Sequence, residues 1–184
     1  MTRLVGFLRG INVGSHIVKK EELTRVFTSL GFQDVATYKQ SGNVIFEAED
    51  GNQNLVRTKI EGKLRHALGY EVAVVLRTIP QLKAIVGRNS RPAKEGNSVL
   101  VTLLPGPVEG HPLVLPLTLP KSGAEIYSFS GSEFFSLTHG GGEGALPNPF
   151  LESKLKVKAT TRNMNVLRGI VEKFGQAPRK PLKT

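Results

Sequence analysis

Cysteine and tryptophan are both absent from this chain of 184 residues. The lack of cysteine excludes a disulfide framework, a thiol nucleophile and a thiolate metal site. Long hydrophobic runs are missing too, since the longest apolar stretches have about five residues and a membrane-spanning helix needs about twenty. The N-terminus lacks the charged and then apolar pattern of a signal peptide. These absences predict a cytoplasmic protein with no membrane partner.

Familiar catalytic motifs are missing as well. The sequence contains no GxSxG nucleophile turn, no HExxH or CxxC motif and no calcium-binding loop. Its histidines do not have the spacing of metal ligands, so we expect no metal site. Only His16 lies beside a polar loop, where it would be placed to act as an acid or a base. The sequence leaves open whether the protein is an enzyme, and it indicates no cofactor.

The net charge of +10 is concentrated near the C-terminus. Residues 1–150 contain 16 Lys and Arg and 13 Asp and Glu, whereas residues 151–184 contain 9 and 2. A basic last helix and tail would suit a nucleic-acid partner, and it fits a solvated helix with a disordered end equally well. Residues 176–184 lack apolar periodicity and contain two prolines, which predicts a flexible basic tail.

A polar loop follows the first apolar run, Leu4–Leu8, which reads as a buried strand. Gly10 and Gly14 permit sharp turns that present backbone N–H groups to a ligand. Arg9 and Asn12 add side-chain donors, and a guanidinium suits a carboxylate or a phosphate. The loop is a candidate anion site, although an ordinary strand-to-helix connection would explain it as well.

Two further stretches share this small, polar and basic character, namely Gln40-Ser41-Gly42-Asn43 and Thr160-Thr161-Arg162-Asn163-Met164-Asn165. With LRGINVG, YxQSGNVIF and ATTRNxN in this order, the chain resembles an uncharacterised bacterial family, domain of unknown function number sixteen ninety-seven. The resemblance runs from about Arg3 to Phe174 and implies an α+β fold with three polar motifs, but no activity. The chain departs from the family pattern at Ser15, where glycine is usual, and at Met164, where tryptophan is common.

The candidate ligand-binding residues are those of the three motifs. They are Arg9, Gly10, Asn12, Gly14, Gln40, Ser41, Asn43, Thr161, Arg162, Asn163 and Asn165.

The first half of the chain predicts the order β-α-β-β-α-β. The expected strands are Leu4–Leu8, Val35–Lys39, Val44–Ala48 and Val72–Leu76, with one helix bearing Leu23, Val26, Phe27 and Leu30 and a second at Asn52–Leu68 that buries Ile60, Leu64, Ala67 and Leu68. This order is typical of the ferredoxin-like arrangement, in which both helices cover one face of a four-stranded antiparallel sheet. Because the last strand is apolar at every position, the other face must also be covered.

The second half is expected to provide that cover. It predicts a helix at Ile79–Val86, a strand at Val99–Leu104, a proline-rich crossing, a hairpin of Ile126–Phe129 with Phe134–Leu137, a short helix near Phe150–Leu155 and a last helix bearing Leu167, Ile170, Val171 and Phe174. We therefore predict an α+β fold with a ferredoxin-like unit at 1–77, a second unit at 78–175 that packs on its sheet, and the tail at 176–184. The second unit could be a degenerate copy of the first.

Function depends on whether the motifs meet. If the loop after the first strand lies near the start of the last helix, Arg9, Asn12, Arg162 and Asn165 would converge on a pocket for a phosphate or a carboxylate. Alternatively, the same residues only join the two halves, with asparagines capping loops and arginines paired with carbonyls. The segment 40–43 would then be an ordinary hairpin turn.

The sequence thus predicts a protein that binds a small anionic ligand. One alternative is a nucleic-acid binder, because RNA-recognition modules share this element order, yet the central strands offer only Phe7 and Phe46 for base stacking. Another alternative is a non-catalytic assembly protein with an exposed apolar patch. The sequence does not indicate an oligomeric state.

Overall fold

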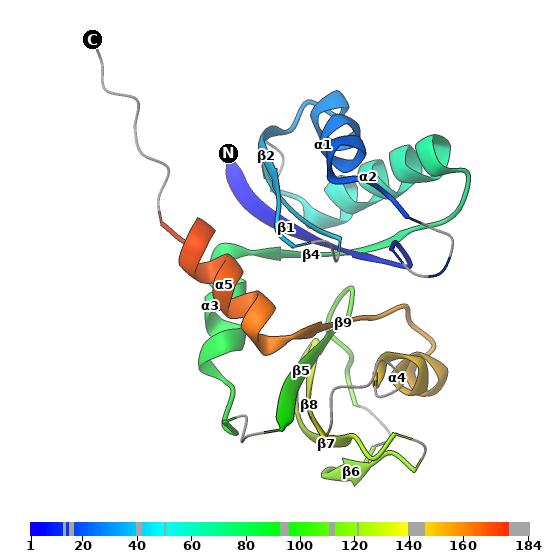
Figure 1. The fold of residues 1–184 in the computed structure, drawn as a ribbon, viewed down its shortest axis with the longest axis vertical. Coiled ribbons are helices and arrows are strands. Elements are labelled where there is room, and N and C mark those ends of the chain that lie inside the picture. The colour runs from blue at the N-terminus through cyan, green and yellow to red at the C-terminus, as the bar shows by residue number, and fades with distance from the viewer. Residues whose placement is uncertain are drawn as a thin grey trace.

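In a computed structural model the chain folds into two antiparallel sheets with five helices in its described part (Figure 1). The structure describes all residues except 13, 15–16, 40–41, 50, 93–95, 111–112, 121, 140–145 and 177–184. Three candidate residues, His16, Gln40 and Ser41, and most of the predicted tail therefore lie outside the described residues. None of the described helices is both long enough and apolar enough to cross a bilayer.

The first half has the predicted order β-α-β-β-α-β. Its elements are β1 (Thr2–Arg9), α1 (Lys20–Ser29), β2 (Gln33–Thr37), β3 (Asn43–Ala48), α2 (Gln53–Leu68) and β4 (Ala73–Thr78). The strands form one sheet in the order β2-β3-β1-β4, and all neighbouring strands are antiparallel. The ferredoxin-like prediction is confirmed.

Local signals explain where α2 begins and ends. It begins after Asn52, whose Oδ1 accepts hydrogen bonds from the N–H groups of Asn54 and Leu55, and it ends at Gly69 in the left-handed conformation. Together with α1 it buries an apolar face against one side of the sheet (Figure 1). Ala67, predicted on this face, is exposed instead, because the last turn of α2 contacts the core through Leu68.

The second half repeats the strand topology of the first. Its elements are α3 (Ile79–Gly87), β5 (Asn97–Leu103), β6 (Leu117–Thr118), β7 (Glu125–Ser130), β8 (Glu133–His139), α4 (Asn148–Leu155), β9 (Thr160–Asn163) and α5 (Met164–Phe174). The antiparallel order is β6-β7-β8-β5-β9, so β7-β8-β5-β9 matches β2-β3-β1-β4. A proline-rich crossing and the short β6 stand where the first half has α1. Neither β6 nor β9 was expected from the sequence.

The second half covers the sheet face that α1 and α2 leave free (Figure 1). Val5, Phe7, Ile45 and Val75 share one buried apolar cluster with α3, α5 and the second sheet. Phe7 and Phe46 are both fully buried. The sheet face that RNA-recognition modules keep open for bases is therefore closed here. The division into folding units at 1–77 and 78–175 stays a prediction.

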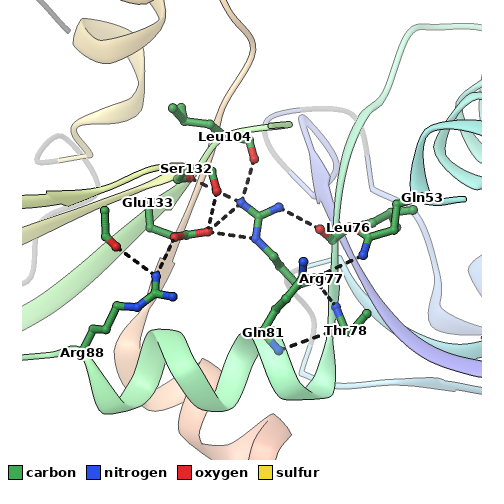
Figure 2. A network of polar contacts seen from close by, with 10 residues as sticks. Gln53, Leu76, Arg77, Thr78, Gln81, Arg88, Leu104, Ser132 and Glu133 are labelled. Atoms are coloured by element: carbon green, nitrogen blue, oxygen red, sulfur yellow. Dashed lines mark hydrogen bonds and ion pairs between the residues drawn. The ribbon is translucent and has the colours of Figure 1, made fainter. Parts of the chain in front are cut away.

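A buried ion pair joins the two halves next to α3 (Figure 2). Arg77, in β4, donates its Nε–H to Glu133 Oε1 at 3.0 Å, and the two side chains are only 6% and 5% exposed. Arg77 also donates to the carbonyl oxygens of Leu76 and Leu104, both at 2.8 Å. Burial lowers the pKa of Arg77, and the charge and hydrogen bond of Glu133 oppose that shift. This network fixes the end of β4 to the second sheet.

Candidate functional site

A cavity of about 690 Å³ opens beside the start of α1. Its wall comes from the loop after β1, the first turn of α1 and the β2–β3 hairpin, and it therefore includes residues of the first and second motifs. This cavity is called the lysine cavity below. It is lined by Asn12, Ile17, Val18, Lys19, Lys20, Glu21, Leu23, Thr37, Lys39, Gly42 and Asn43.

Positive charge dominates this lining. Lys19, Lys20 and Lys39 contribute three ammonium groups, whereas Glu21 contributes one carboxylate. Lys20 Nζ lies 3.8 Å from Glu21 Oε1, but both side chains are mostly exposed, so this ion pair is weak. The lining therefore carries a net positive charge.

The start of α1 adds backbone donors to the same wall. Its N-cap residue is Lys19, and in the described chain no side chain caps the helix. The Lys19 carbonyl accepts the N–H groups of Glu22 and Leu23 at 3.1 and 3.2 Å. The N–H groups of Lys20 and Glu21 belong to the set that a helix cannot satisfy by itself. Such a helix start favours a nearby anion, although the acidic side chains of Glu21 and Glu22 offset part of this effect.

Two motif loops touch each other at the cavity. The N–H of Leu8 donates to Gly42 O at 2.8 Å, and Gly42 has a φ of 67°. A Cβ at Gly42 would lie 2.7 Å from Ile11 Cδ1, so only glycine fits here without displacing Ile11. Asn12 closes its own loop, because its Oδ1 accepts the N–H of Val18 at 2.9 Å.

The second and third motifs meet directly behind this wall. Asn43 is 1% exposed; its Oδ1 accepts the Nε–H of Arg162 at 2.7 Å, and its Nδ2 donates to Tyr38 O at 3.0 Å. Arg162 also donates to Leu8 O at 2.8 Å and to Thr160 Oγ1 at 2.7 Å. One guanidinium thus holds β1, the β2–β3 hairpin and β9 together.

The guanidinium of Arg162 donates its hydrogen bonds to uncharged groups. Its acceptors among the described residues are all uncharged oxygens, including Thr161 O at 2.9 Å. Its Cζ lies 5.7 Å from the ring centroid of Phe7, which suits a cation–π contact. Burial lowers the pKa of Arg162 to about 10, so the side chain remains charged at neutral pH. This charge adds to the positive potential behind Asn43.

Arg9 contacts another element, on the other side of β1. Its Nη2 donates to Glu152 Oε2 on α4 at 2.7 Å, and Glu152 Oε1 accepts the N–H of Ala159 at 2.7 Å. In the sheet Arg9 pairs with Ala73 of β4, whereas Asn43 belongs to β3 on the opposite side of β1. Arg9 is therefore not among the residues that line the lysine cavity with Asn12 and Asn43, and a ligand site that unites all three motifs stays a prediction.

The remaining third-motif residues serve β9 and α5. Asn163 caps α5, because its Oδ1 accepts the N–H of Asn165 at 2.9 Å, and Asn165 itself is exposed. Thr161 Oγ1 lies 2.8 Å from Thr102 Oγ1 and 3.3 Å from Asn148 Oδ1. In the first motif, Gly10 and Gly14 are exposed and both have a positive φ. Many of the motif residues thus join the two halves or cap a helix or loop, as the alternative to a ligand site predicts.

Sequence reasoning missed the three lysines and Glu152. Lys19 and Lys20 lie just before the acidic first turn of the first helix, and Lys39 directly precedes the second motif. Basic residues flanking two candidate anion loops were the signal that could have identified the cavity. Glu152 carries a comparable signal, since it is one of two acidic residues in a strongly basic segment.

A family model described as a protein of unknown function, DUF1697, matches residues 1–135. The chain belongs to the DUF1697 family. The matched region contains the whole lysine cavity and ends before β9 and the third motif. No curated protein is significantly similar to this DUF1697 protein.

The same fold is found in a solved structure. The conserved bacterial protein SP0830 from Streptococcus pneumoniae aligns with a TM-score of 0.65 and 22% sequence identity. The alignment covers 96% of this chain and 99% of that chain, so both halves of the DUF1697 protein are included.

Proposed function

We propose that this DUF1697 protein binds a small anionic ligand, one that carries a phosphate or a carboxylate, in the lysine cavity. The observation that carries the proposal is that three lysines and an uncapped helix start share one cavity wall with two motif loops. The cavity volume of about 690 Å³ also falls within the range of about 300–1,000 Å³ found for small-molecule sites.

The residues divide into two roles in this proposal. Lys19, Lys20 and Lys39 supply charge, and the N–H groups at the start of α1 donate to the oxygens of the anion. Asn43 and Arg162 act as positioning residues, because their hydrogen bond holds the hairpin that forms the opposite wall.

Thermal unfolding with inorganic phosphate tests the proposal. At one hundred times its dissociation constant a ligand stabilises by roughly 2.7 kcal/mol, which should raise the melting temperature of a protein of this size by about 5–10 °C. We expect the double variant Lys20→Ala/Lys39→Ala to lose this shift. The charge-matched control is Lys59→Ala/Arg168→Ala, whose two side chains are exposed and lie outside the cavity, and it should keep the shift.

Phosphate also strengthens burial of apolar surface in any protein, so specific binding is the shift that the wild type shows beyond Lys20→Ala/Lys39→Ala at the same phosphate concentration. Simple phosphate esters and dicarboxylates extend the panel. The proposal fails if every member of the panel shifts the wild type and Lys20→Ala/Lys39→Ala equally, or if both double variants lose the shift.

A further inference from the structure

A second cavity, of about 670 Å³, lies between the two halves on the β4 side of β1. It is called the cleft below. From the first half its wall takes Arg9, Gly10, one face of α2 and the start of β4; from the second half it takes Pro105 and residues 157–159. Cavities between structural units are frequent ligand sites. The lysine cavity lies on the β3 side of the same strand, so the two cavities flank the first motif.

Several cations in the cleft are available to a ligand. Arg57 and Lys158 take part in none of the ion pairs of the described residues. Arg65 lies 3.9 Å from Glu71, but these side chains are 72% and 86% exposed, so a ligand can compete for Arg65. Arg57 and Arg65 are two turns apart on α2, about 12 Å along the helix axis. The cleft is therefore lined by cationic side chains at several separate positions.

Of the two carboxylates that line the cleft, Glu61 is already engaged and Glu71 is mostly exposed. Glu61 Oε1 accepts the N–H of Val74 at 2.9 Å and thereby covers the open edge of β4. Arg9 has a buried Nε with no hydrogen-bond partner among the described residues, although its Nη2 binds Glu152. Because buried donors are nearly always paired, an unpaired Nε–H at the cleft wall favours a ligand that supplies an acceptor.

Gly62 gives a second, independent indication. It lies in the middle of α2 on the cleft wall, and a Cβ there would meet no atom of the described part of the chain within 4 Å. Packing therefore does not require glycine, which costs about 1 kcal/mol relative to alanine inside a helix. What the glycine provides is open space between Arg57 and Arg65.

From these observations we infer that the cleft binds a second ligand, an oligoanion with at least two phosphate or carboxylate groups. Separate cations on α2 and at Lys158 match separate anionic groups, and a ligand bound to both would bridge the two halves. None of the described lining residues is aromatic, so the cleft offers a nucleobase no stacking surface.

Amide chemical shifts of 15N-labelled protein titrated with linear tripolyphosphate test the inference at constant ionic strength. We expect saturable shifts at Gly62 and at residues 72–75, with tripolyphosphate binding at least tenfold tighter than orthophosphate. Arg57→Ala/Arg65→Ala should weaken this binding at least tenfold. The control Lys59→Ala/Lys63→Ala removes the same charge from α2 outside the cleft, and it should change the dissociation constant less than twofold.

A second variant tests the shape of the cleft without changing any charge. Gly62→Leu fills the open wall with a good helix former, so it should weaken tripolyphosphate binding without lowering the melting temperature. The inference is overturned if the amides of residues 62 and 72–75 do not respond, or if both double variants weaken binding equally. If tripolyphosphate moves only the amides at the start of α1, the cleft inference fails while the proposed lysine cavity stands.

Discussion

Arg162 and Asn43 lie 119 positions apart in the sequence, and a hydrogen bond of 2.7 Å joins their side chains. This bond links the third sequence motif to the second. Because the same guanidinium also binds Leu8 O, it fixes the end of β1 against the β2–β3 hairpin. The β2–β3 hairpin thus contacts Arg162 through Asn43 and also forms part of the wall of the lysine cavity.

Arg162→Ala should lower the free energy of unfolding by about 3 kcal/mol. The substitution removes the guanidinium donor from Asn43 Oδ1 and from the carbonyl oxygen of Leu8, and the loss of a hydrogen bond to a buried polar group costs about 1–3 kcal/mol. Urea denaturation measures the loss. Arg168→Ala is the matched control, because Arg168 is exposed on α5, and it should stay within about 0.5 kcal/mol of the wild type. Equal, small effects would contradict the joining role of Arg162.

Gly42→Ala should destabilise the protein more than Gly14→Ala. The two glycines have similar φ angles of 67° and 60°, so the backbone strain of the substitution is similar. A Cβ at Gly42 meets Ile11, whereas a Cβ at Gly14 has no atom of the described residues within 4 Å. We expect an extra loss of about 1–2 kcal/mol at Gly42 in urea denaturation, since overpacking a buried contact costs this much. Indistinguishable losses would show that the contact with Ile11 is not tight.

Glu133→Ala should cost about 3–5 kcal/mol of unfolding free energy, because it leaves the buried Arg77 guanidinium without its charge partner. The control is Glu125→Ala, which breaks the more exposed ion pair with Arg91 and should cost less than about 1 kcal/mol. Chemical denaturation of both variants gives the comparison. A loss at Glu133 no larger than at Glu125 would mean that the joint between the halves does not depend on this charge.

Tyr127 should ionise above its ordinary pKa of 10.0. Burial raises this pKa; the nearby Arg91 opposes the shift, and Glu125 adds to it. The folded state therefore holds the phenol proton more tightly than the unfolded state. The corresponding stability is fully present below pH 10 and is lost as the pH rises through the folded-state pKa. The difference in ultraviolet titration between the wild type and Tyr127→Phe should have its midpoint above pH 10; a midpoint at or below 10 would contradict the burial of this hydroxyl.

The first half of the fold could be predicted because each element carries its own signal. Leu23, Val26 and Phe27 mark the buried face of α1, and Gly69 marks the end of α2. By contrast, β6 and β9 have only two and four residues, too few to show an alternating pattern.

The candidate site could be predicted only in part. The motifs identified the cavity loops, because glycine and asparagine at turns are a local signal. The cavity that a residue lines depends on the order of strands in the sheet, however. The sequence therefore did not show that Arg9 and Asn43 line different cavities. Lys20 and Lys39 share a cavity only because the β2–β3 hairpin folds beside the start of α1.

The anion site is tested most directly by titrating 15N-labelled protein with inorganic phosphate at constant ionic strength and following the amide signals of Lys20 and Glu21. We expect both signals to shift saturably in the wild type and in Lys59→Ala/Arg168→Ala, and to stay unchanged in Lys20→Ala/Lys39→Ala, where residue 21 remains as the reporter. If phosphate leaves the amides of Lys20 and Glu21 unmoved in the wild type, or moves residue 21 equally in all three proteins, the lysine cavity is not an anion site.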